Sequence, residues 1–146
     1  MRPSAVVAAA VFVCATVASA AHVVELSTWG APGDARFDVV VDSSGTLTVT
    51  RESFPRTDEG LTKKTVTKHL SRAQLQKLIK LATDATDFTA GCRAVADGTS
   101  ASLVVIHDGK ETKRTCHNAD VWPNGKKSRA LMNAINRIVP GEMRVY

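Results

Sequence analysis

Aromatic residues are scarce in this 146-residue chain and make up only 5% of it. So few rings cannot form the stacking platform that single-stranded nucleic acids use, and no specific nucleic-acid partner is expected. The chain also lacks a nucleophile elbow, because Gly98-Thr99-Ser100 precedes a strand and does not join a strand to a helix. No cofactor motif is present, and we expect no cofactor. These gaps favour a binding protein over an enzyme.

Long apolar runs are also lacking. The one from Ala5 to Ala18 is shorter than the roughly 20 residues that span a bilayer, so we expect no membrane span. It follows the basic start Met1 to Ser4 and ends at the small residues Ala18-Ser19-Ala20, which is the pattern of a cleavable signal peptide. We therefore expect residues 1–20 to be a signal peptide, residues 21–146 to be a single domain, and the protein to be secreted or periplasmic.

Three cysteines are present, and Cys14 lies inside the signal segment. The remaining two, Cys92 and Cys116, predict one disulfide in an exported chain. The closed loop of about 25 residues would contribute about 3 kcal/mol. A zinc site using Cys92, His107, Cys116 and His117 is the alternative, but the hairpin described next separates His107 from Cys116 by about 20 Å at 3.3 Å per residue. We favour the disulfide and expect no metal.

The segment between the two cysteines predicts a β-hairpin. Ala101 to His107 is rich in β-branched residues, Asp108-Gly109 is a signal for a type I′ turn, and Lys110 to Cys116 forms a polar return strand. This register pairs His107 with Lys110 and Ala101 with Cys116. Leu103 to Ile106 is apolar on both faces, which indicates an interior strand, whereas the polar return strand belongs at an edge.

Further strands are expected at residues 22–28, 37–41, 46–51 and 62–69. Phe37, Val39 and Val41 share one face by the two-residue period, and Leu47 and Val49 face the same core. The strand at 62–69 is rich in lysine, as suits a sheet edge.

Two helices complete the expected fold. Ser71 and Gln74 form a capping box, and the helix that follows carries an apolar stripe of Leu75, Leu78, Ile79 and Ala82 before ending near Asp84. Phe88 is expected to fill the core. A last helix begins between Pro123 and Ser128 and runs to Val139. The order of elements predicts an α+β fold: a mostly antiparallel sheet of about five to six strands with two helices packed on one face.

This pattern resembles a bacterial family of small exported or lipoprotein-like domains of unknown function. The resemblance rests on the hairpin of Phe37 to Arg51, the Ser-led helix with Leu75-Gln76-Lys77-Leu78, the strand pair about Asp108-Gly109-Lys110, and the helix from Leu131 to Ile138. The chain lacks the acylated cysteine and the first-loop cysteines that members of that family often carry. The resemblance implies the α+β fold and no particular activity.

Two loop tryptophans are the first candidates for binding. Trp29 begins the turn-rich loop up to Asp34, and Trp122 lies in the loop from Asn118 to Gly125. Exposed aromatic side chains commonly anchor protein contacts. We therefore expect a non-enzymatic binding protein whose partner is an unknown protein or an anionic surface polymer. Plugging the ends of the sheet is the alternative role for both tryptophans.

A basic surface is the second candidate. Six basic residues and no acidic residue lie between Leu61 and Thr83, and such a face can bind polyanions. An ordinary solvated face is the alternative interpretation. The six residues are Lys63, Lys64, Lys68, Arg72, Lys77 and Lys80.

A small extracytoplasmic hydrolase remains an alternative function. It would use His107 or His117 with an aspartate as acid and base. Asp84 and Asp87 could form a carboxylate pair, although aspartates after a helix are commonly residues of solvated turns. No convergent catalytic set is apparent, so no catalytic residue is assigned.

Overall fold

The computed structural model describes residues 21–29, 35–53, 60–119 and 125–145. Its strands are His22–Trp29 (β1), Ala35–Asp42 (β2), Thr46–Ser53 (β3), Thr62–His69 (β4), Ala94–His107 (β5) and Lys110–Ala119 (β6). Its helices are Arg72–Asp84 (α1) and Lys126–Asn136 (α2), followed by a short 3-10 helix at Gly141–Met143 (η1).

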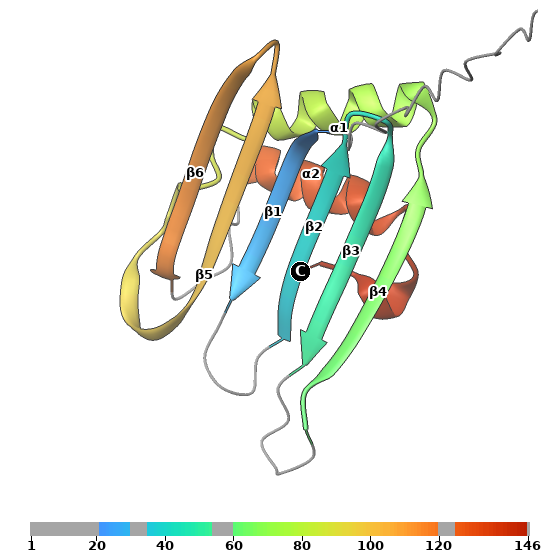
Figure 1. Ribbon diagram of the computed structural model, residues 1–146. Coiled ribbons are helices and arrows are strands. Elements are labelled where there is room, and N and C mark those ends of the chain that lie inside the picture. The colour runs from blue at the N-terminus through green and yellow to red at the C-terminus, as the bar shows by residue number, and fades with distance from the viewer. Residues whose placement is uncertain (1–20, 30–34, 54–59, 120–124, 146) are drawn as a thin grey trace, which may run out of the picture.

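The strands form one six-stranded sheet in the order β4-β3-β2-β1-β5-β6 (Figure 1). Every neighbouring pair is antiparallel. The lysine-rich β4 and the polar β6 are the two edges, and β5 lies inside the sheet, as their sequences predicted. The α+β class with an antiparallel sheet is confirmed.

The hairpin between β5 and β6 has the predicted turn. Asp108 and Gly109 both have positive φ, at 51° and 72°, as a type I′ turn requires. His107 pairs with Lys110 and Ala101 with Cys116, which confirms the expected register. β5 begins earlier than expected, at Ala94, and the register shifts between this residue and Ala101.

The core is built from alternating strand residues and from the apolar stripes of the helices. Phe88, which follows α1, is 1% exposed and fills the core as predicted. From β1, β2, β3 and β5, the buried residues are Val24, Leu26, Phe37, Val39, Val41, Leu47, Val49, Ala101, Leu103 and Val105, joined by Leu78 and Ala82 of α1 and by Leu131 and Ile135 of α2.

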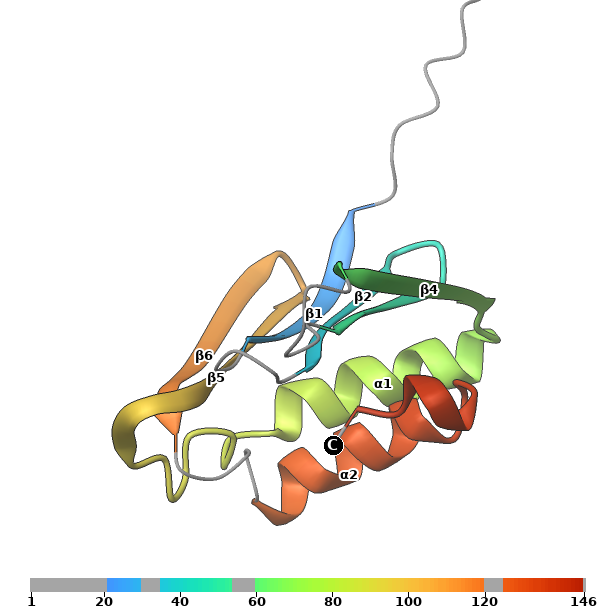
Figure 2. The ribbon, with the colours of Figure 1, turned by 90° about the horizontal axis from the view of Figure 1, so that it is seen from below.

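Helix α1 packs against β1 and β5, and α2 packs against α1 (Figure 2). The expectation that two helices pack on one face of the sheet is therefore confirmed for α1 alone. The main contact of α2 is with α1 and not with the sheet. The predicted capping box of α1 is confirmed, because Ser71 Oγ accepts from the Gln74 amide and Gln74 Oε1 accepts from the Ser71 amide.

Helix α2 starts within the predicted window but ends at Asn136, before the expected Val139. The chain beyond it packs against the rest of the domain, because Met143 and Val145 are fully buried. The Asn136 side-chain amide also donates to the Val145 carbonyl and accepts from the Val145 amide. The end of the described chain is therefore part of the core.

Candidate functional site

Trp29 is the last residue of β1 and not a loop residue as expected. It is 40% exposed, and with Leu61 it is one of two exposed large hydrophobic residues in the described chain. Residues 30–34, which form the rest of the first predicted loop, lie outside the described residues. Trp122 of the second predicted loop does so too. Asn118 and Ala119, placed in the second loop by the sequence, belong to β6.

The sheet brings Trp29 beside a histidine that is distant in sequence. Trp29 pairs with Ser100 of the neighbouring strand β5. The residue after Ser100, Ala101, pairs with Cys116 of β6, so the residue after Cys116, His117, lies next to Ser100. Trp29 and His117 are therefore on the two sides of Ser100. The two rings are 6.5 Å apart between centroids and inclined by 64°, in an edge-to-face arrangement.

A disulfide lies directly beside the His117 half of this aromatic pair. Cys92 and Cys116 are bonded, as predicted, with their Cα atoms 5.9 Å apart. Cys116 is 2% exposed, so the residue before His117 is fixed in the interior while the histidine ring stays on the surface. The pairing also occupies both thiols that the zinc hypothesis required.

A polar face runs across all six strands next to the aromatic pair. The register aligns one row across it, and every residue in that row has a hydroxyl or a carboxylate. We call the surface that contains this row the polar face. In sheet order, the row consists of Thr65, Thr50, Asp38, Ser27, Ser102 and Thr115.

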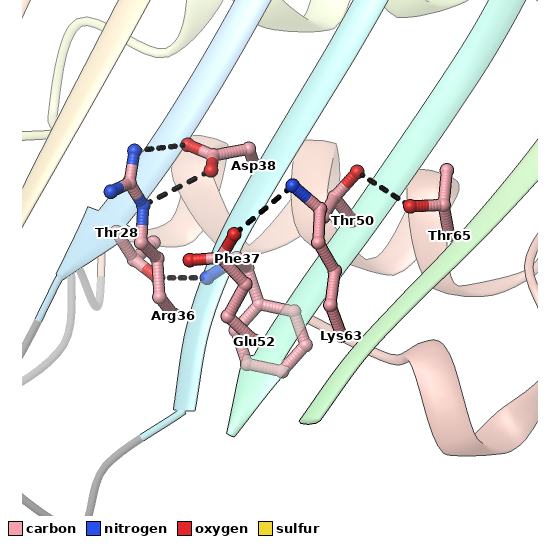
Figure 3. A network of polar contacts seen from close by, with 8 residues as sticks. All are labelled: Thr28, Arg36, Phe37, Asp38, Thr50, Glu52, Lys63 and Thr65. Atoms are coloured by element: carbon pink, nitrogen blue, oxygen red, sulfur yellow. Dashed lines mark hydrogen bonds and ion pairs between the residues drawn. The ribbon is translucent and has the colours of Figure 1, made fainter. Parts of the chain in front are cut away.

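On β2, β3 and β4, charged side chains of the polar face form pairs (Figure 3). Arg36 donates to Asp38 through Nε at 3.0 Å, and the Lys63 ammonium lies 3.2 Å from the Glu52 carboxylate. The Thr50 and Thr65 hydroxyls are 3.2 Å apart. This end of the polar face is therefore polar without a net charge.

The six basic residues predicted to form one patch are divided by the fold. Lys63 lies on the polar face, and the strand period turns Lys64 and Lys68 the other way. Lys64 lies 3.8 Å from Glu142, and Lys80 lies 2.8 Å from Asp84. Together with Lys63, three of the six basic residues therefore have acidic partners. The remaining division is between strand and helix, because Arg72, Lys77 and Lys80 belong to α1.

Two grooves on the helices were not predicted. One, of about 200 Å³, has an apolar floor between α1 and α2 with Lys77 and Arg137 at its rim. The other, of about 350 Å³, is lined by Asn133, Asn136, Arg137 and Arg144. No signal in the sequence indicated either groove, because contacts between helices cannot be read from the apolar stripe of each helix alone.

The histidines do not converge. His107 ends β5 beside the hairpin turn, 3.4 Å from Asp108, whereas His117 lies near the opposite end of β6, about 23 Å away at 3.3 Å per residue. Asp84 and Asp87 do not form a carboxylate pair either: Asp84 contacts Lys80, and Asp87 binds the start of α2. Asp87 is thus not the solvated turn residue that its sequence position favoured.

The described residues have neither a metal-binding cluster nor a membrane-crossing helix. They contain no cluster of three or more His, Cys, Asp or Glu side chains that could hold a metal ion. None of the described helices has the length and apolar character needed to cross a membrane. No family model matches the chain, and no curated protein matches it.

Proposed function

We propose that this protein is a secreted or periplasmic, non-enzymatic binding module that contacts a partner protein through the Trp29 end of its polar face. The observation that carries the proposal is the exposed Trp29 ring, held edge-to-face against His117. Tryptophan is enriched among residues that dominate binding energy, because one ring buries a large area with little loss of rotamer entropy.

The surroundings of Trp29 support such a role. A disulfide anchors β6, the strand that carries His117, so a partner would not have to order that part of the surface. The adjacent polar face offers hydroxyl groups and paired charges, as the polar rim of a protein interface does. In this proposal both helices cover the opposite face of the sheet, which leaves the polar face free for contact.

The compartment is part of the proposal. A signal-like start, residues 1–20, precedes a domain with a disulfide, and disulfides persist in oxidising compartments. Edman or mass-spectrometric sequencing of the exported protein tests this point. A mature start near residue 21 supports it, and an intact Met1 on exported protein contradicts it.

The binding surface is tested by affinity capture from the extracellular or periplasmic fraction of the producing cells. Wild-type protein is compared with Trp29→Ala, His117→Ala and Ile106→Ala. Ile106 is a matched apolar control, because it lies at the other end of β5 on the same face. Partners that bind through the proposed site are lost with Trp29→Ala and retained with Ile106→Ala; equal capture by all variants refutes the site.

Two alternative functions predict different results. A polyanion-binding module is retained on a heparin-like resin at moderate salt and loses this retention when Lys68, Arg72 and Lys77 are replaced by glutamine. A hydrolase shows activity that disappears with His107→Ala or His117→Ala. The pairing of Lys63, Lys64 and Lys80 with acidic residues weakens the first alternative, because paired cations attract an anion less strongly.

A further inference from the structure

β4 presents an open, regular edge. Within the described chain it pairs only with β3, and every residue except Val66 is exposed. The β3–β4 register runs without a shift from Thr46 opposite His69 to Ser53 opposite Thr62. An edge strand turns the N–H and C=O groups of alternate residues to solvent, where they can pair with another strand.

The two edges of the sheet differ in how they are protected. The β5–β6 pairing contains register shifts, and β6 is tied down by the disulfide at Cys116. β4 has no bulge, proline or glycine, so among the usual protective devices only its lysines remain. Like charge repels a second copy: an antiparallel β4–β4 pair centred between Thr65 and Val66 would place Lys63 against Lys68.

Charge protects the edge selectively, because an acidic strand is attracted by the same lysines. On the side of β4 that faces the core, Lys64 and Lys68 flank Val66, which packs partly buried against the core. Carboxylates four residues apart, about 13 Å in a strand, would reach both lysines, and an apolar residue between them would extend the core beyond Val66.

The existing partners of these lysines do not prevent such binding. Lys64 with Glu142 is an exposed ion pair, a kind that contributes only about 0–1 kcal/mol. In the pair of Lys63 with Glu52 the lysine is exposed, although the Glu52 side chain is largely buried. Among the described residues, no carboxylate forms an ion pair with Lys68. Leu61, immediately before β4, is 56% exposed and offers an apolar contact at that end of the edge.

We propose that β4 binds an extended acidic segment of a partner protein, which adds to the sheet as a seventh, antiparallel strand. In this segment, acidic residues lie opposite Lys68, Lys64 and Lys63. An apolar residue lies opposite Val66. Main-chain hydrogen bonds supply affinity, and the side chains supply specificity, as in other cases of strand addition. This surface does not depend on Trp29.

The test uses the capped peptide Asp-Thr-Val-Thr-Glu-Glu, written so that its first residue faces Lys68. Titration into ¹⁵N-labelled protein should give saturable shifts centred on the β4 amides. A scrambled peptide of the same composition should bind at least fivefold more weakly. Two further peptides are N-methylated at alternate positions. The peptide whose methylated amides would face β4 should not bind, whereas the peptide whose methylated amides face away should bind nearly as well as the unmodified one.

Charge reversal supplies the second arm. Lys64→Glu with Lys68→Glu should weaken peptide binding at least tenfold, whereas the matched pair Lys110→Glu with Lys113→Glu on β6 should change it less than twofold. Circular dichroism and melting curves confirm that each variant is folded. Trp29→Ala should leave the peptide affinity unchanged, because Trp29 is not part of this surface. A negative peptide result would therefore contradict strand addition at β4 without contradicting the proposed function of Trp29.

Several results would overturn strand addition. Equal affinity for the scrambled peptide or for both N-methylated peptides would assign binding to net charge, as for a polyanion. Shifts centred on β6 would place the site at the wrong edge. Absence of binding at millimolar peptide, with wild-type protein folded, would remove the proposal.

Discussion

Asp87 holds the start of α2 from 40 residues away, and replacing it should destabilise the fold. One carboxylate oxygen accepts from the Lys127 amide at 2.8 Å, and the other accepts from the Ser128 amide at 2.9 Å and the Ser128 hydroxyl at 2.7 Å. These amides belong to the first turn of a helix whose own N-cap, Gly125, has no side chain to offer. Asp87 is therefore the N-cap side chain of α2, supplied from another part of the chain.

The magnitude follows from what Asp87→Ala leaves unsatisfied. Loss of an N-cap side chain costs about 1 kcal/mol. The Ser128 hydroxyl, in a residue that is 1% exposed, also loses its acceptor, which adds about 1 kcal/mol. The free energy of unfolding should fall by about 2 kcal/mol in total, which lowers the urea midpoint by roughly 1 M for an m-value near 2 kcal/mol/M.

Two further variants separate capping from general loss of charge. Asp84→Ala is the matched control, because its carboxylate is exposed and, among the described residues, forms an ion pair with Lys80 on the surface; it should lower the midpoint much less. Gly125→Ala should reproduce the defect, because the new methyl carbon would overlap the Asp87 carboxyl group and displace it. The double variant with Asp87→Ala should then be less than additive. Equal midpoints for Asp87→Ala and Asp84→Ala would refute the reasoning.

The same carboxylate gives a pH dependence. Burial is the largest influence and raises the pKa of Asp87, but the hydrogen bonds from the Ser128 hydroxyl and from the Lys127 and Ser128 amides together hold this pKa below its ordinary value of 3.8. A depressed folded-state pKa stabilises the fold above the ordinary value, and this stabilisation is lost as the pH falls through the folded-state pKa. The stability difference between wild type and Asp87→Asn should shrink below about pH 4 in urea titrations.

Three other predictions concern stability in urea. Replacing Cys92 and Cys116 by serine should lower the free energy of unfolding by about 3 kcal/mol, because the open chain gains entropy when unfolded; an unchanged midpoint would contradict this. Gly45→Ala should cost about 1–2 kcal/mol, since φ is +89° at this position, and a variant as stable as wild type would show that the turn can rearrange. Arg114→Met should cost about 0.5–1 kcal/mol, because the guanidinium donates to the last carbonyl groups of α1 at 3.3 Å; Lys113→Met is its exposed control.

The elements predicted well from the sequence are those whose signals are local. The turn at Asp108-Gly109 fixes a hairpin register within its own strands, and Ser71 with Gln74 caps α1 from adjacent residues. In both cases the residues that make the contact are also neighbours in the sequence, so a short pattern contains the whole interaction.

The features missed by the sequence depend on contacts between distant segments. Asp87 caps α2, and Arg114 of β6 reaches the end of α1, so neither helix end can be read from its own residues. The contact of Trp29 with His117 requires β1 to lie beside β5, although the sequence indicates only that β1 and β2 are successive strands. The order of strands is decided by the packing of the whole sheet.

The lysines of β4 show why a correct structural prediction does not determine function. An edge strand needs charge to prevent pairing with another copy, and Lys63, Lys64 and Lys68 supply it. That requirement explains the lysines, and packing against the core explains the partly buried Val66 between two of them, but neither explains the exposed Leu61 beside them. The lysines are thus accounted for both by protection of an edge that is unpaired within the described chain and by the proposed acidic strand, and the binding experiment with the acidic peptide separates the two roles.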